Sequence, residues 1–474
     1  MPSKLEIFIG RSSECQKLVE ALNDSRVVTL SGISGIGKSA VIKEVSHYLY
    51  ARNFMKDGIL YFSLVDCHSV ESLFNKFVLF IKDTLKDSED EEIANKAEII
   101  NSFEGCLRLV KDKEILLIFD NWDWILKEDN NNFLRIIEEI LARIHQSRIV
   151  VTAKNPIGQI KDITEKVIKI QKLTKNESYE LLLAKSPKKM QQDELDEMVE
   201  ELVRRNLPTN QVISILEHPL FDMVNGHPLA LVMISSLRKE MRLKQIYELL
   251  VLIKEEIDSS KKWSVENIAI HLSMEANLLF LRNIDYNTYE SLIYFSLMSS
   301  GMNNEGCSIL FGNQWEEYKA LLLSRSLIWQ RFNISKDPQN SVYRIDSNLK
   351  NIVLKRTTQE EIDNWDFKII HLLNENLQKY FKNPQLNDKT VHTLFIQLEG
   401  NIWDIFKRIK KRQIMLKKDG NLEPDSPKKN DYNENESSWI FTSESDSFCT
   451  DEEMSEEEDK VEELKSFLHV PKPK

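Results

Sequence analysis

The stretch that decides the fold lies at residues 32–39 and reads Gly-Ile-Ser-Gly-Ile-Gly-Lys-Ser. It matches the pattern G-x-x-x-x-G-K-[ST] in full. Glycines at these positions let successive backbone N–H groups curl around a diphosphate, and the following helix directs the positive end of its dipole there. The pattern predicts that Lys38 reaches the β- and γ-phosphates and that the Ser39 hydroxyl binds Mg²⁺. The other predicted contacts of this phosphate loop are Gly32, Ser34, Gly35, Ile36, Gly37 and Ala40.

The residues around the loop have the pattern of a strand before it and a helix after it. Residues 26–30 are rich in β-branched side chains, and residues 39–50 repeat apolar side chains at helical spacing. Short apolar runs then alternate with helical patterns up to residue 170, which favours an α/β domain with a parallel sheet. The further expected strands are 59–64, 115–119, 148–152 and 167–170, and the further expected helices are 12–22, 69–85, 93–110 and 132–144.

Asp120 directly follows the apolar run 115–119. An α/β sheet binds its ligands at the carboxyl ends of its strands, so Asp120 is predicted to hold Mg²⁺ directly or through water. Asn121 stands where many ATPases place a second carboxylate. An amide cannot accept a proton, although it can orient a water molecule, so the sequence predicts nucleotide binding and leaves hydrolysis open. Asp123 and Glu128 remain open as substitutes.

The chain changes character beyond the α/β region. The pattern is helical from residue 174, and Asp, Glu, Ser and Asn dominate the end, where too little apolar surface exists to offset the entropy of ordering. The sequence predicts an α/β domain (1–172), a helical domain (173–278), a smaller unit of helices and strands (279–357), a helical segment (358–416) and a disordered acidic tail (417–474).

Charge and composition limit the classes of protein that remain. Of the net charge of −12, the tail holds −9, because it has 8 Lys and Arg against 17 Asp and Glu. The near-neutral remainder gives no support to a general nucleic-acid binder. The five cysteines are scattered without a C-x-x-C pair, which fits a reducing compartment. There is no long apolar run and no evident secretory signal, so we expect no membrane contact. The expected location is the cytoplasm, with the nucleus an open alternative.

Four further motifs accompany the phosphate loop in order. Residues 8–14 read Phe-Ile-Gly-Arg-Ser-Ser-Glu, residues 116–121 Leu-Leu-Ile-Phe-Asp-Asn, residues 148–154 Arg-Ile-Val-Val-Thr-Ala-Lys, and residues 226–231 Gly-His-Pro-Leu-Ala-Leu. This series resembles the NB-ARC group of the STAND class of P-loop ATPases, which includes apoptotic activators, plant disease-resistance proteins and bacterial regulators. The resemblance runs from about residue 7 to about residue 400 and is strongest up to residue 240.

The resemblance implies roles for residues outside the loop. Arg11 would contact the nucleotide or an acidic neighbour, and Pro228 would pack on the adenine. Thr152 and Lys154 would lie on the strand that senses the γ-phosphate, with Lys154 in place of the usual arginine. The alternative interpretations are an ordinary helix start at Pro228 and a solvated lysine at Lys154. His227 is expected to be a bystander.

The resemblance also implies a winged-helix-like domain at 279–357, and here the chain departs from the family. A histidine that helps to hold the ADP β-phosphate in the closed state would align with Asp346. An anionic carboxylate would repel phosphate, so we expect at most a modest preference for ADP.

The function predicted from these features is a signalling switch that responds to ATP or ADP. The nucleotide and Mg²⁺ would bind between the α/β domain and the helical and winged-helix domains, with slow or absent hydrolysis, and Asp120, Asn121 and Lys154 would act on the γ-phosphate. Protein partners and nucleotide-dependent self-association are expected. Two alternatives stay open: a DNA-handling winged-helix ATPase, and a scaffold that nucleotide stabilises without turnover.

Overall fold

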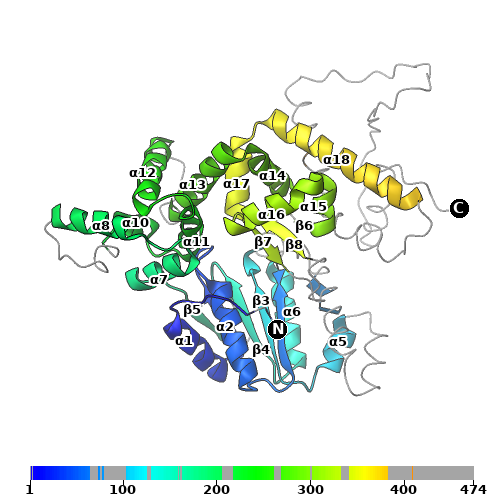
Figure 1. Cartoon of the computed structure of the whole chain (residues 1–474). Coiled ribbons are helices and arrows are strands. Elements are labelled where there is room, and N and C mark those ends of the chain that lie inside the picture. Colours follow the sequence, from blue (N-terminus) through cyan, green and yellow to red (C-terminus); the bar gives the residue numbers. More distant parts are fainter. Residues whose placement is uncertain are drawn as a thin grey trace, which may run out of the picture. The chain divides into compact units, whose positions relative to one another are not determined.

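The structure is a computed structural model of the 474-residue chain, and its cartoon is drawn in Figure 1. It describes residues 2, 4–64, 73–74, 77–78, 103–124, 130–158, 160, 163–204, 217–260, 268–298, 301–331, 341–382 and 408. Most of the expected helices at 69–85 and 93–110, together with Glu128 and the acidic tail, lies outside these residues. The chain divides into two compact units, one comprising Met1–Tyr289, Glu317–Asp337 and Asp346–Leu349, the other Glu290–Glu316, Pro338–Ile345 and Lys350–Lys474.

A five-stranded parallel sheet forms the centre of the first unit, as the alternating pattern predicts. Its strands are β1 (Val27–Ser31), β2 (Gly58–Ser63), β3 (Ile115–Asp120), β4 (Arg148–Ala153) and β5 (Glu165–Lys169). Their order is β2-β3-β4-β1-β5. The inner strands β1 and β3 are buried along their whole length, which explains why they read as unbroken apolar runs. The edge strand β5 is largely exposed and begins two residues before the expected run.

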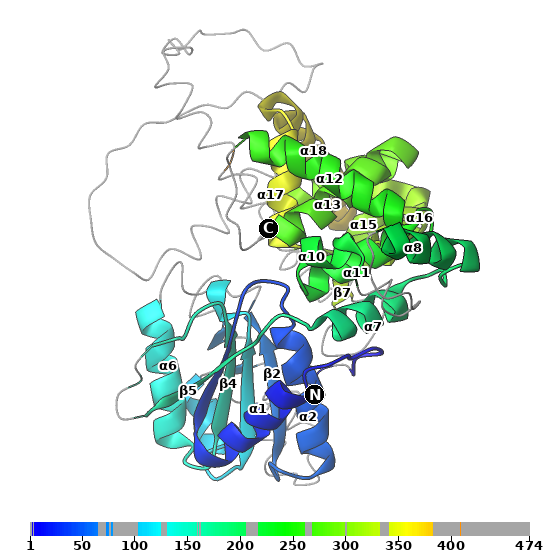
Figure 2. The same cartoon turned by 90° about the vertical axis from the view of Figure 1, so that its left-hand side faces the viewer.

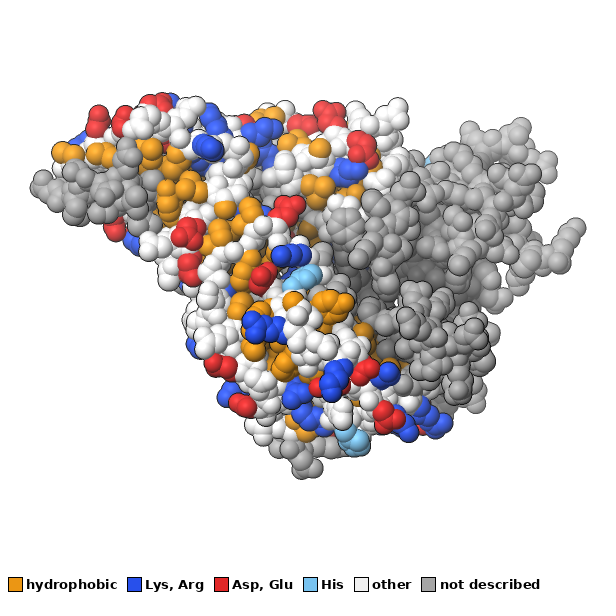
Figure 3. Space-filling model, turned by 60° about the horizontal axis from the view of Figure 1, so that its bottom comes forward, with side chains coloured by type: hydrophobic (Ala, Val, Ile, Leu, Met, Phe, Trp, Pro, Cys, Tyr) orange, Lys and Arg blue, Asp and Glu red, His pale blue; other side chains and the backbone are white. Residues whose placement is uncertain are grey.

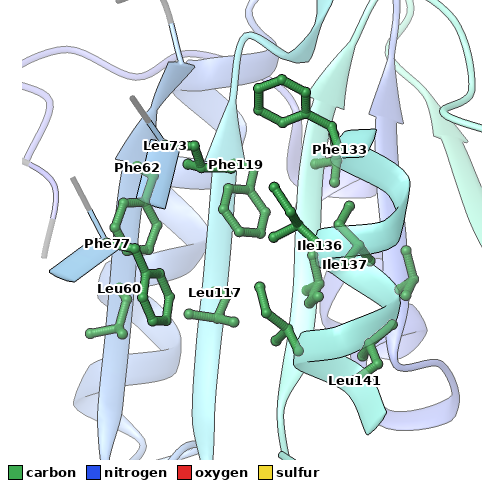
Figure 4. Close-up of a cluster of buried hydrophobic side chains, with 14 of the residues drawn as sticks. Leu60, Phe62, Leu73, Phe77, Leu117, Phe119, Phe133, Ile136, Ile137 and Leu141 are labelled. Atoms are coloured by element: carbon green, nitrogen blue, oxygen red, sulfur yellow. The ribbon is translucent and has the colours of Figure 1, made fainter. Parts of the chain in front are cut away.

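Helices cover both faces of this sheet (Figure 2). One face packs against α1 (Ser12–Asp24) and α2 (Lys38–Ala51), through Leu18 and Val41 among others. The other face packs against α6 (Asn130–Arg143) and α5 (Phe103–Leu109). Figure 4 shows the second core, in which side chains of β2 and β3 face those of α6. Trp122 is fully buried in this core, where its ring contacts those of Phe119 and Phe133.

The order β2-β3-β4-β1-β5 decides what the phosphate loop faces. The chain leaves β1 into the loop, and β4 lies directly beside β1, with Leu30 opposite Thr152. β3 is the next strand, and β2 follows it with Ser63 opposite Asp120. Because all pairs are parallel, the carboxyl ends of β1, β4 and β3 meet at one edge of the sheet.

A helical region follows the sheet within the same unit. Its helices are α7 (Lys175–Lys185), α8 (Gln192–Arg204), α10 (Pro219–Val224), α11 (Pro228–Leu237), α12 (Leu243–Ser260) and α13 (Ile268–Ile284). Helix α7 begins with a reciprocal capping box between Thr174 and Glu177. A buried ion pair of Glu194 with Arg238 links α8 to the end of α11, and the same carboxylate accepts the backbone N–H of Leu243. The region has its own apolar core.

The later elements follow in the order α14 (Tyr286–Leu297), β6 (Met302–Asn303), α15 (Asn304–Phe311), α16 (Trp315–Ser324), β7 (Ile328–Arg331), β8 (Val342–Ile345), α17 (Ser347–Arg356) and α18 (Gln359–Lys382). Within the second unit, β6 pairs antiparallel with β8. Phe295, Phe311 and Tyr343 surround Trp315, whose indole N–H donates to Asn304. The winged-helix interpretation of 279–357 stays a prediction.

Candidate functional site

The phosphate loop joins β1 to α2 and depends on glycine geometry at two positions in particular. Gly35 and Gly37 have φ angles of 71° and 105°, a region that side chains with a Cβ rarely adopt. A Cβ added at Gly37 would meet no atom within 4 Å, whereas one at Gly35 would fall 2.8 Å from the Cβ of Leu229. The loop is thus open at Gly37, at the start of α2, and closely packed at Gly35.

Lys38 is buried and folds back over the loop. Its Nζ donates to the carbonyl oxygens of Gly32, at 2.7 Å, and Ile33, at 3.0 Å. Burial lowers the pKa of the ammonium group, and the charge of Lys154 lowers it further, while the carboxylates of Asp123 and Asp120 oppose this shift. The phosphate-binding lysine predicted from the motif therefore lies in an enclosed place with both signs of charge around it.

Asp120 gathers four hydrogen bonds from four different elements or loops. Ser39 Oγ, at 2.9 Å, and Thr152 Oγ1 donate to its Oδ1. The hydroxyl of Tyr61 and, at 3.4 Å, the amide of Asn121 donate to its Oδ2. Asp120 is only 3% exposed, so these donors replace the solvation of its carboxylate. The structure thus brings together Ser39, Asp120, Asn121 and Thr152, four of the candidate site residues, and their roles toward nucleotide and metal stay predictions.

The ends of β3 and β4 are also tied through their backbones. The N–H of Asn121 donates to Thr152 Oγ1 at 2.9 Å, and Asn121 itself has a positive φ of 68°. Two residues further along the chain, Asp123 Oδ1 accepts the N–H of Lys154 at 2.7 Å. The side chain of Lys154 is exposed, as the solvated interpretation expects, yet its charge acts on Lys38.

The oxygens of Ser39 and Asp120 suit a magnesium ion. A hydroxyl and a carboxylate lie 2.9 Å apart next to the open side of the loop, and hard oxygen donors of this kind are what Mg²⁺ prefers. Among the described residues, no cluster of three or more His, Cys, Asp or Glu side chains could hold a metal. A pair of protein ligands fits an ion that is shared with phosphates and water.

Arg11, which precedes α1, is hydrogen-bonded to the backbone of the loop. Its guanidinium donates to the carbonyl oxygens of Ile36, at 2.9 Å, and Gln171, and it pairs with Glu14 at 3.0 Å. The acidic neighbour predicted as one alternative is therefore present. A contact of Arg11 with nucleotide stays a prediction.

The first turn of α11 contacts the loop on its closely packed side. His227 Nδ1 accepts the N–H of Ala230, so the ring proton is on Nε2, which donates to the carbonyl of Ser34 at 3.0 Å. The N–H of Leu229 donates to the carbonyl of Gly35 at 3.3 Å. Burial lowers the pKa of His227 to about 4. The expectation that His227 is a bystander is wrong, because this side chain links α11 to the loop.

Pro228 is the first residue of α11, where its missing N–H costs no hydrogen bond. This is the ordinary helix start that was one of its two interpretations, and packing on an adenine stays a prediction. Asp346 accepts the N–H of Asn348 in the first turn of α17, at 2.8 Å. Burial raises the pKa of this carboxyl, while its hydrogen bonds lower it.

Sequence reasoning missed Tyr61 and the role of His227. A signal for Tyr61 was its position on a strand next to β3, but only the strand order gives that neighbour. The signal for His227 was its place before the Pro-Leu-Ala-Leu run, where a side chain with an acceptor caps a helix.

The family comparison concerns the first part of the chain. Residues 12–192 match the family model of the NB-ARC domain. This segment of the chain is therefore an NB-ARC domain, a P-loop nucleotide-binding domain of the STAND class of ATPases, as the motifs predicted. The matched segment contains the whole sheet, the phosphate loop and α7.

Solved structures match this chain only at low sequence identity. A STAND protein with a tetratricopeptide repeat sensor from Pyrococcus horikoshii is 15% identical with a TM-score of 0.48, and the match covers 88% of this chain and 54% of that one. This chain thus spans about half the length of that protein. The Walker-type ATPase of Pyrococcus abyssi is 12% identical with a TM-score of 0.35, and the match covers 75% of this chain and 98% of that one. Drosophila ORC bound to DNA is 11% identical with a TM-score of 0.35, and the match covers 74% of this chain and 96% of that one. The search of curated proteins found no match.

Proposed function

We propose that this protein is a nucleotide-dependent signalling switch that binds ATP with Mg²⁺, or ADP, at the phosphate loop. In this proposal Lys38 holds the β- and γ-phosphates, and Ser39 and Asp120 hold the metal. The ion, when bound, would neutralise phosphate charge. Thr152 and Asn121 orient Asp120, and Lys154 senses the γ-phosphate from the end of β4.

One observation supports a conformational switch in addition to nucleotide binding. The first turn of α11 is hydrogen-bonded to two consecutive loop carbonyls, through His227 to Ser34 and through Leu229 to Gly35. Because the C=O and N–H of a trans peptide point in opposite directions, these bonds favour a loop state whose N–H groups face away from α11, where they could face bound phosphates, over a state in which they do not. The helical region therefore has a differential interaction with the two states of the loop, which is the condition for a ligand to shift a conformational equilibrium.

The proposal is tested with the full chain loaded with either nucleotide. We expect ADP or ATP to co-purify with the protein, and we expect size and hydrodynamic radius to differ between the ATP and ADP states. Mass analysis of the extracted nucleotide and sedimentation velocity measure these. The absence of any bound nucleotide, together with no binding in a calorimetric titration with Mg·ATP, would contradict the proposal.

The DNA-handling alternative is less well supported by the described surface. A recognition helix at α16 would need exposed cations, but Glu316 and Glu317 are exposed there, and Arg325 at its end is buried in an ion pair with Glu240 at 3.1 Å. On the face drawn in Figure 3, basic side chains of the described residues are interspersed with acidic ones. The scaffold alternative differs from the switch in predicting no ATP turnover.

Partners and location are further parts of the proposal. We propose self-association in the ATP state and protein partners in the cytoplasm. Each described helix is too short or too polar to span a bilayer.

A further inference from the structure

A switch that resets itself needs a group that can take a proton from the attacking water. The following inference rests on the proposed function and asks which side chain does this. The group must be a carboxylate or an imidazole near the phosphate-binding lysine, with an acceptor atom available to water. The described residues at this edge of the sheet offer two carboxylates, Asp120 and Asp123.

Asp120 is not suited to this task. Its oxygens accept from Ser39, Thr152, Tyr61 and Asn121, which uses the capacity of a carboxylate for hydrogen bonds. Any metal that it binds would further reduce its basicity.

Asn121, the residue at the position of the usual second carboxylate, is not suited either. Its amide has no proton-accepting group of the required basicity, and its Nδ2 faces Asp120 at 3.4 Å. Its backbone N–H is held by Thr152. The positive φ of 68° fixes the chain here, so that the next residues turn back toward β4.

Asp123 has the required position and an available oxygen. Its Oδ1 accepts the N–H of Lys154 at 2.7 Å, which fixes the carboxylate at the end of β4. Among the described residues, no donor is bonded to its Oδ2. Of the charged groups around the Lys38 ammonium, Asp123 has the largest effect, ahead of Asp120. Asp123 is half-buried, so water can reach it.

We propose that Asp123 is the general base of ATP hydrolysis in this protein. A water molecule donates a hydrogen bond to Asp123 Oδ2, and its oxygen forms a bond with the γ-phosphorus. The bond between the γ-phosphorus and the β–γ bridging oxygen breaks. Oδ2 takes the water proton and later releases it to solvent, so that ATP and water give ADP, inorganic phosphate and a proton. The hydrogen bond from Lys154 couples this base to the strand that senses the γ-phosphate.

The test uses three variants of the full chain. Asp123→Asn keeps an oxygen that can accept the Lys154 N–H but removes the base, and Asp123→Ala removes both. Asp112→Asn, at an exposed carboxylate before β3, is the control with the same change of charge. Phosphate release from Mg·ATP is measured under single-turnover conditions, and the affinities for ATP and ADP are measured by calorimetric titration.

We expect both Asp123 variants to lose about 10²- to 10⁴-fold in the rate of phosphate release. We expect Asp123→Asn to bind ATP and ADP within about 3-fold of the unchanged chain, and Asp112→Asn to retain its turnover. If Asp123→Asn hydrolyses ATP normally and only Asp123→Ala is slow, Asp123 merely positions β4 and the inference is wrong. An unchanged chain that binds ATP but never hydrolyses it also overturns the inference, while the proposed binding function stands. A chain that binds no nucleotide would instead refute the proposed function.

Discussion

The two sides of the phosphate loop are held by different chemistry. On the side of the sheet, side-chain donors converge on one acceptor, the carboxylate of Asp120. On the side of the helices, Arg11, His227 and the N–H of Leu229 donate to carbonyl oxygens of the loop backbone. The first side presents groups that a metal or phosphate can use. The second fixes the backbone that presents them.

This difference separates the residues that would bind nucleotide from those that link the loop to the helical region. A change on the side of the sheet should alter affinity in a way that depends on Mg²⁺ or on phosphate. A change on the side of α11 should alter both nucleotides alike, together with the stability of the helical region. The following predictions, from the largest expected effect to the smallest, test that separation.

Lys38→Ala should have the largest effect. Removal of the ammonium eliminates charge-assisted hydrogen bonds worth about 1.5–3 kcal/mol each, so nucleotide affinity should fall by at least about 100-fold. The folded state should persist, because the lost contacts are with loop carbonyls rather than with the apolar core. Titration with a fluorescent ATP analogue measures this, with Lys17→Ala, an exposed lysine on α1, as the control of equal charge change. Equal ATP affinities of Lys38→Ala and Lys17→Ala would contradict the assignment of residues 32–39 as the phosphate loop.

Asp120→Asn should weaken ATP binding by about 10- to 100-fold when Mg²⁺ is present. The effect should be smaller without the metal and smaller for ADP, since the carboxylate is proposed to act through the ion. Titrations with each nucleotide, with Mg²⁺ and with a chelator, give the four affinities. If the variant still responds fully to Mg²⁺, the metal site lies elsewhere.

Acidification should destabilise the chain through His227. Burial lowers its pKa to about 4, and the charges of Lys172 and Arg11 contribute, whereas the Ser34 carbonyl opposes the shift. In the unfolded chain the imidazole titrates near 6.5, so its stabilisation is complete above that pH and is lost as the pH falls toward 4. Between pH 7 and pH 5 the loss should be about 2 kcal/mol. Urea unfolding at both pH values should show a smaller loss for His227→Asn. An identical pH dependence would show that His227 is solvated.

A pair of variants at His227 should have the smallest effect. His227→Asn keeps a side-chain acceptor for the first turn of α11 but is too short to reach Ser34, whereas His227→Ala removes both bonds. We expect both to lower ATP and ADP affinity equally, by about 5-fold for one hydrogen bond, and His227→Ala to lower the melting temperature further. A change in affinity for only one nucleotide would mean that His227 contacts the ligand and does not act through the loop backbone.

The sequence was sufficient for the parts of the site that depend on local spacing. The phosphate loop, the helix after it and the acidic end of β3 lie within short stretches whose residue types leave few alternatives, and the NB-ARC domain could be identified from them. Strand limits shifted by one or two residues, since the ends of a strand depend on its partners. Pro228 as a helix start is local in the same sense.

The tertiary structure alone decided which side chains meet. Tyr61 reaches Asp120 because β2 lies beside β3, and Asp123 reaches Lys154 because η2 (Trp122–Trp124) follows β3 next to the end of β4. His227 is 193 residues from the Ser34 carbonyl that it binds. Such pairs form when packing of the sheet and helices offsets the entropy of closing long loops, and no local pattern records which distant residues that packing brings together.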